Sequence, residues 1–201
     1  MVFENAWYIA PLVAILSILT GFYILRWVKA QEAGGERTRF IGGAIKTGSQ
    51  AFLNRMYRTL AMFVGVMALI LLVFLPHPIW ATTTPLNNVI LTVAYIFGSV
   101  CSGIAGFVGM DVATDSNMRS ATAAEKHGIS KAFQVSYRGG SVMGLAVVGL
   151  ALVGVSIVYY LTRDPTYIVG FSFGASSMAL FAKAGGGIYT KTADIAADLV
   201  V

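Results

Sequence analysis

Charged side chains are scarce in this sequence. Asp, Glu, Lys and Arg together make up 11% of its 201 residues, whereas apolar and aromatic residues make up 57%. So few charges cannot cover the surface of an ordinary soluble domain, and the mean hydropathy of +0.75 also excludes that class. The composition therefore predicts an all-α polytopic integral membrane protein.

Several common features are missing as well. The sequence has one cysteine, Cys101, in an apolar stretch, so a disulfide framework is excluded and we expect a buried structural thiol. The first apolar stretch is too long for a cleaved signal peptide, and its basic residues follow it, which predicts a retained helix. Neither a Walker-type phosphate loop nor G-x-G-x-x-G occurs, so an ATPase or dinucleotide-binding protein has no support.

Five apolar stretches approach or exceed the length of about 20 residues that a membrane-spanning helix needs. They predict one transmembrane domain over residues 1–201, with spans at about 6–28, 59–75, 86–110, 139–161 and 165–187. Two longer connections cover about 29–58 and 111–138, and apolar spacing in the first predicts an amphipathic helix that runs into the second span. Small residues four apart, such as Gly140 with Gly144 and Gly170 with Gly174, predict close helix packing.

The basic residues are unevenly distributed along the chain. Of 14 Lys and Arg residues, 13 lie in or beside the two long connections or at the end of the fifth span, and only Arg163 lies on the other side. The positive-inside rule then places the N-terminus outside and both long connections in the cytoplasm. Because these residues form no continuous patch, we interpret them as topology signals and expect no nucleic-acid partner.

Charges reappear in the last span after an uncharged stretch at 171–182. Lys183, Gly187, Lys191, Asp194 and Asp198 follow at steps of four, four, three and four, which places them on one helical face. Two carboxylates one turn apart repel unless a positive group lies near them, and Mg²⁺ is the natural candidate because it prefers oxygen ligands. Lys191 would then meet a phosphate. The alternative is a solvated helix end with ordinary pairing between neighbouring turns.

Three segments resemble those of one family. The residues AKAGGGIYTKTADIAADLV resemble GGGIYTKAADVGADLVGK of membrane-bound pyrophosphatases, pumps that hydrolyse pyrophosphate and move H⁺ or Na⁺. IKTGSQAFLNRMYR resembles I-R-E-G-A-x-A-F-L-x-R-E-Y-K, with Lys46 in place of the usual arginine, and GMDVATDSNMRS resembles G-M-x-x-A-T-x-A-N-x-R-T. Asp111 and Asp115 fall at open positions of that last pattern, and we interpret them as charges on a cytoplasmic helix extension, not as a metal pair.

The resemblance implies roles for the charged residues of the last span. Lys191 would contact pyrophosphate, Asp194 and Asp198 would hold Mg²⁺, and Lys183 would stand where the family usually has an arginine of the ion gate. Lysine keeps that charge without the planar guanidinium fork; the alternative is a lysine that snorkels to the cytoplasmic interface.

For the whole protein the resemblance implies a homodimer in the cell inner membrane, surrounded by lipid. This chain would be an N-terminal fragment that supplies five transmembrane helices of a larger helical bundle. We expect no catalytic residue in it and no activity alone, because the carboxylates that hold the attacking water come later in the family. The competing hypothesis is a non-enzymatic transporter or channel. The choice between H⁺ and Na⁺, and any K⁺ requirement, stays open.

Overall fold

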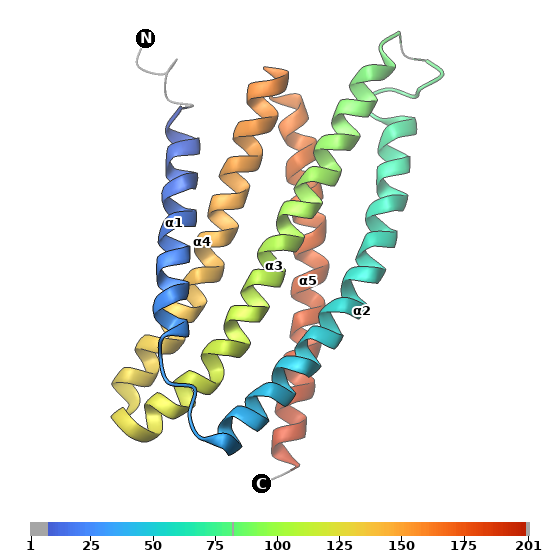
Figure 1. Cartoon of the computed structure of the whole chain (residues 1–201). Coiled ribbons are helices and arrows are strands. Elements are labelled where there is room, and N and C mark those ends of the chain that lie inside the picture. The colour runs from blue at the N-terminus through green and yellow to red at the C-terminus, as the bar shows by residue number, and fades with distance from the viewer. Residues whose placement is uncertain (1–7, 82, 200–201) are drawn as a thin grey trace.

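The computed structural model describes residues 8–81 and 83–199, and in these residues it contains five α-helices and no β-strand (Figure 1). The helices run alternately in opposite directions: α1 (Ile9–Lys29), α2 (Glu36–Phe74), α3 (Pro85–His127), α4 (Ile129–Thr162) and α5 (Thr166–Asp198). Each is long and apolar enough to cross a membrane. The predicted fold class, an all-α polytopic membrane protein with five helices, is therefore confirmed.

The helices extend well beyond the expected membrane spans. The span expected at 6–28 corresponds to α1, although residues 6 and 7 lie outside the described residues. The connections expected at 29–58 and 111–138 are mostly helical. Within them only residues 30–35 and Gly128 lie outside the helices. At 39 and 43 residues, α2 and α3 are about 60 Å long, twice the thickness of a hydrocarbon core. The first turns of α2 and the last turns of α3, which lie near the C-terminal end of α5, therefore form a helical region outside the bilayer (Figure 1).

Helix α3 lies at the centre of the molecule. It packs against α2, α4 and α5, whereas α1 packs mainly against α4 (Figure 1). The largest fully buried side chains include Tyr95 of α3 and Phe171 of α5, and the predicted thiol Cys101 is buried and free. Phe171 packs with Cys101 and Val158, so α3, α4 and α5 share one apolar core.

The backbones of α3 and α5 touch through small residues. A Cβ atom on Gly98 would lie 2.0 Å from the carbonyl oxygen of Phe171, and one on Gly174 would lie 1.9 Å from that of Tyr95. The Ser99 hydroxyl, in the same contact, donates to the Gly174 carbonyl at 3.2 Å. No side chain larger than hydrogen fits at either glycine, so these two positions set the distance between the helices.

The expected G-x-x-x-G contact of α4 is not observed. An added Cβ on Gly140 or Gly144 would meet no atom within 4 Å, so this pair packs against nothing in the described part of the chain. The close contact on α4 is made by its neighbour Gly139, where a Cβ would lie 2.2 Å from the Ser116 hydroxyl oxygen of α3. The spacing identified small residues but not which side of the helix meets a neighbour.

Replacing Gly174 by Ala should destabilise the protein. The new methyl would force α5 away from Tyr95 or distort one of the helices, at a cost of about 1–3 kcal/mol. Gly144→Ala is the matched control, because it also adds a methyl to a helical glycine but meets open space. Thermal unfolding in detergent should show a lower midpoint for Gly174→Ala alone. Equal midpoints for the two variants would contradict the close contact.

Candidate functional site

The charged face of the last span lies on one uninterrupted helix. Because α5 continues to Asp198, the predicted residues Lys183, Lys191, Asp194 and Asp198 do share a face. All four are exposed, and none has an ion-pair partner within the described residues. The structure thus brings Lys191 and both aspartates together at the end of the helix, with their polar groups open to a ligand.

The donor chemistry of this face suits a hard divalent cation. Asp194 and Asp198 offer carboxylate oxygens, and Mg²⁺ commonly takes one or two carboxylates and completes its shell with water and phosphate oxygens. No group of three or more His, Cys, Asp or Glu residues that could hold a metal occurs among the described residues. The two aspartates therefore fit as part of a magnesium site but do not complete one.

Helix α2 supports this end of α5. The rings of Phe52 and Tyr189 lie 4.9 Å apart between centroids, and Tyr189 comes two residues before Lys191. One turn earlier, Gly185 lies against Met56, whose sulfur would be 3.0 Å from an added Cβ. Gly185 begins a run of three glycines within the helix, and the other two, 186 and 187, have no atom within 4 Å of an added Cβ. The amphipathic half of α2 thus holds the turn that precedes Lys191.

Lys183 lies at a large apolar cavity. The cavity has a volume of about 640 Å³, is bordered by α2, α3, α4 and α5, and is lined by side chains that include Met56, Met143 and Phe171. Among the described lining residues Lys183 is the charged one. A cation beside so much apolar surface is costly in a membrane and is usually paired with an acid from another helix.

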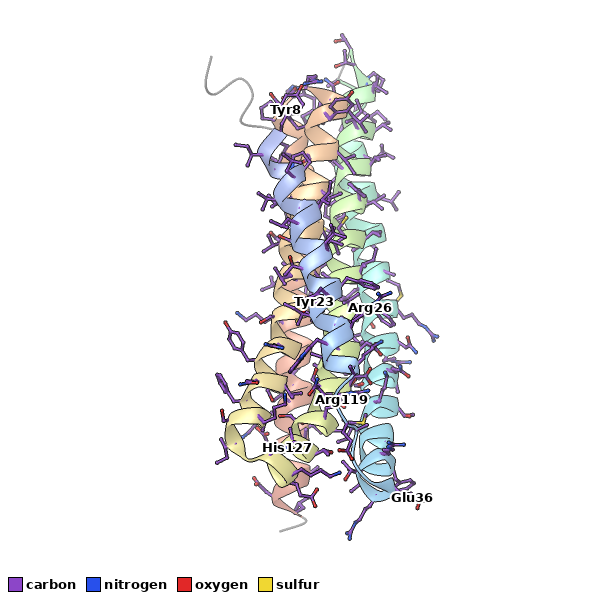
Figure 2. The ribbon with its side chains drawn as sticks, turned by 60° about the vertical axis from the view of Figure 1, so that its left-hand side comes forward. Tyr8, Tyr23, Arg26, Glu36, Arg119 and His127 are labelled. Atoms are coloured by element: carbon purple, nitrogen blue, oxygen red, sulfur yellow. The ribbon has the colours of Figure 1, made fainter. Side chains whose placement is uncertain are left out.

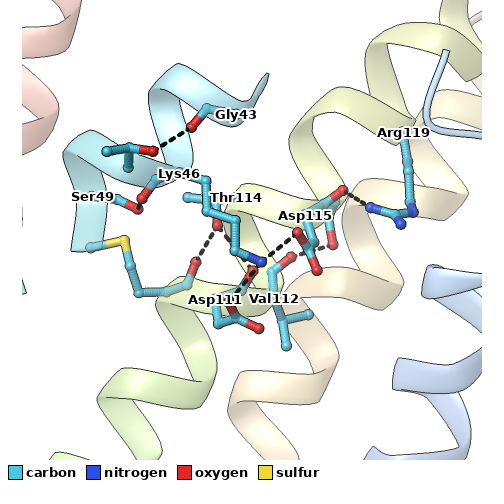
Figure 3. Close-up of polar contacts among 11 residues, drawn as sticks. Gly43, Lys46, Ser49, Asp111, Val112, Thr114, Asp115 and Arg119 are labelled. Carbon is cyan, nitrogen blue, oxygen red and sulfur yellow. Dashed lines mark hydrogen bonds and ion pairs between the residues drawn. The ribbon is translucent and has the colours of Figure 1, made fainter. Parts of the chain in front are cut away.

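The structure reveals an ion cluster that sequence reasoning missed. Lys46 of α2 lies between two carboxylates of α3, with its Nζ 2.8 Å from Oδ1 of Asp111 and 2.8 Å from Oδ1 of Asp115 (Figure 3). Asp115 is buried, and Arg119 donates to its backbone carbonyl at 2.7 Å. Burial alone would lower the pKa of Lys46, but hydrogen bonds to Asp111 and Asp115 outweigh it and raise that pKa above 10.5.

This cluster explains why Asp111 and Asp115 occur one turn apart. Lys46 neutralises part of their charge and joins the two helices, so these acids lie on a helical extension as expected but have a cationic partner there that was not expected. The available signal was the pair of acids at a spacing of four, which requires a nearby cation. The sequence did not show which of the many basic residues supplies it.

Comparison with known proteins finds one family model and several relatives that match this chain. The model of the family described as "Inorganic H+ pyrophosphatase" matches residues 15–201. A K(+)-insensitive pyrophosphate-energized proton pump of Methanosarcina mazei is 39% identical over 197 residues, which is 98% of this chain and 28% of the relative. A putative K(+)-stimulated pyrophosphate-energized sodium pump of Clostridium tetani is 42% identical over 190 residues, 94% of this chain and 26% of the relative.

A plant protein is similar over the same extent. The pyrophosphate-energized membrane proton pump 3 of Arabidopsis thaliana is 35% identical over 213 aligned residues, which cover 94% of this chain and 26% of the relative. The chain therefore spans between 26% and 28% of the length of these three relatives.

Replacing Lys46 by Met should destabilise the protein by about 1–2 kcal/mol, because Asp111 and Asp115 would face each other without a cation in a partly buried place. In the unsubstituted protein the raised pKa of Lys46 means that its contribution is complete below pH 10.5 and is lost above that value.

Thermal unfolding in detergent between pH 7 and 11 measures this loss, and Lys46→Arg should keep most of the stability of the unsubstituted protein. Lys126→Met is the control, because Lys126 also pairs with a carboxylate, that of Glu32, but both side chains are about half exposed. A Lys46→Met midpoint that does not change relative to the control at any pH would refute the role of the cluster.

Proposed function

Because the chain belongs to the inorganic H⁺ pyrophosphatase family, we propose that it forms the N-terminal part of a membrane pump driven by hydrolysis of Mg-pyrophosphate. The pump moves H⁺ or Na⁺ across the membrane. One observation carries this proposal: an exposed face of α5 bears Lys191, Asp194 and Asp198, and none of the three has an ion-pair partner among the described residues. In a carrier or channel without hydrolytic activity, the same residues would be a solvated helix end with no affinity for Mg-pyrophosphate.

Each residue of this face has a role that suits its chemistry. The ammonium group of Lys191 binds and orients the phosphate oxygens of pyrophosphate. Asp194 and Asp198 contribute carboxylate oxygens to Mg²⁺, which, when bound, neutralises negative charge on the phosphoanhydride. The groups that position the attacking water belong to other parts of the pump, so this chain binds and orients the substrate but does not complete the reaction.

We place Lys183 in the ion path. It lies eight residues before Lys191 on the same face, about 12 Å along the helix axis, and faces a largely apolar cavity. A charge at that depth is costly unless it takes part in transport or meets an acid from another helix. The alternative, a lysine that extends its chain to the cytoplasmic interface, is compatible with its exposure.

The orientation follows from the distribution of charge. The ends of α2, α3 and α4 that lie near the C-terminal end of α5 carry most of the 14 basic residues, which favours that end as the cytoplasmic side of the cell inner membrane (Figure 1). The N-terminus is then outside, and the face with Lys191 meets pyrophosphate where the cell produces it. The working form is a homodimer.

Replacing either Asp194 or Asp198 by Asn should abolish Mg²⁺-dependent pyrophosphate hydrolysis by the intact pump, because each loses a charged oxygen ligand. Phosphate release in detergent-solubilised membranes measures this loss. Asp164→Asn is the control, because this aspartate lies just before the opposite end of α5. There its carboxylate accepts a hydrogen bond from the Thr166 backbone N–H at 2.8 Å. Normal turnover in Asp194→Asn or Asp198→Asn would refute the assignment.

Replacing Lys183 by Ala should impair ion transport more than hydrolysis. Removing the cation from the ion path leaves the face around Lys191 intact, so affinity for Mg-pyrophosphate should persist. Ion uptake and phosphate release are measured in parallel in proteoliposomes, with Lys183→Arg as the variant that keeps the charge. Unchanged uptake in Lys183→Ala would favour a lysine that only reaches the interface.

A further inference from the structure

Two cations of α4 converge on one aromatic ring of α1. The Cζ atom of Arg138 lies 3.9 Å from the centroid of the Trp27 ring, and the Nζ atom of Lys131 lies 5.0 Å from it. Because both distances end at the same centroid, the two charges can be no further apart than their sum, about 9 Å. Lys131 and Trp27 are half-buried, whereas Arg138 is exposed.

Nothing in the described chain neutralises these two charges. Neither Lys131 nor Arg138 forms an ion pair with a described carboxylate, and Glu32, in the neighbouring connection between α1 and α2, is already bound to Lys126. The face of an indole ring attracts a cation but carries no net charge. Two like charges held this close together therefore leave a local excess of positive charge that an anion would stabilise.

An exposed apolar stripe of α1 leads directly to this place. Leu12, Leu16, Leu19, Tyr23 and Trp27 follow at steps of four, three, four and four, so they share one side of the helix. The first four are between 61% and 72% exposed. Figure 2 shows α1 in front, with Tyr23 and Arg26 labelled towards its lower end. The stripe offers a surface for an acyl chain, and the cations lie where that chain would end.

The depth of Lys131, Arg138 and Trp27 in the membrane suits a lipid headgroup. Trp27 lies at the end of the first expected span, where tryptophan is typical of the membrane interface, and Lys131 lies in the part of α4 that extends beyond its span. Under the orientation proposed above, this is the cytoplasmic leaflet, whose anionic lipids attract basic residues. Basic pockets between membrane helices on that side bind the headgroups of anionic lipids.

We propose that Lys131 and Arg138, both of which contact the Trp27 ring, form a binding site for the phosphate of an anionic phospholipid whose acyl chain lies along α1. The two cations bind the phosphate oxygens from α4, and the stripe of α1 contacts the chain. A lipid bound there joins the peripheral helix α1 to α4 on the side that faces away from α5. This site is independent of the pyrophosphate face, and it does not require that the proposed hydrolysis be correct.

The test measures lipid retention by the intact purified protein. Detergent-solubilised protein is titrated with phosphatidylglycerol or with phosphatidylcholine, and bound lipid is counted by native mass spectrometry. The unsubstituted protein should retain phosphatidylglycerol in preference to phosphatidylcholine. The double variant Lys131→Gln/Arg138→Gln should lose affinity for phosphatidylglycerol by about thirtyfold, because each basic residue near an anionic headgroup contributes about a factor of five.

Two further variants separate this site from general effects of charge and folding. Arg163→Gln removes a cation that also lies over an aromatic ring, Tyr160 at 4.9 Å, but at the opposite end of α4, and it should leave retention unchanged. Lys131→Arg/Arg138→Lys keeps both charges and should retain the lipid. Thermal unfolding midpoints of all variants show whether each is folded.

Three outcomes would overturn the proposal. Equal phosphatidylglycerol retention by the unsubstituted protein and a folded Lys131→Gln/Arg138→Gln variant would exclude the two cations as its ligands. Equal retention of phosphatidylcholine and phosphatidylglycerol would exclude recognition of the anionic headgroup. Displacement of bound lipid by millimolar inorganic phosphate would assign the cations to a free anion and not to a lipid.

Discussion

The close contact between α3 and α5 fixes the direction in which the charged face of α5 points. Gly98 and Gly174 bring the two backbones together, and Ser99 donates across the junction, so α5 cannot slide or rotate without breaking contact with the central helix. The charged face of α5 takes its direction from this contact. Because α3 also packs against α2 and α4, one helix aligns all the elements that surround the cavity at Lys183.

The few charges of this protein fall into two kinds. Lys46 with Asp111 and Asp115 is satisfied inside the structure and joins α2 to α3, as expected of ions that serve to hold helices together. The charges of α5 and those around Trp27 have no described partner of opposite sign. In a sequence with 11% charged residues, unpaired groups of this kind are expensive in or near a membrane, and this cost is why we propose them as ligand-binding positions.

Periodicity and spacing predicted much of this arrangement from the sequence. The apolar stretches indicated the five helices, and the steps from Lys183 to Asp198 indicated a shared face, because both depend only on the local geometry of a helix. The partner of Asp111 and Asp115, 65 or more residues away in the sequence, depends on how α2 crosses α3, which spacing cannot show. The same limit explains why Gly140 and Gly144 were expected to pack when Gly139 does.

The run of three glycines in α5 has a mechanical consequence. Each glycine makes a helix less stable than alanine would by about 1 kcal/mol, and only the first of these three lies against another helix. The stretch that links Lys183 to Lys191 is therefore a part of α5 with weak intrinsic helix propensity, and its contacts with α2 hold it in place. A force applied at the tip of α5 would act on this stretch before it moved the junction with α3, so the tip can shift while the membrane half keeps its register.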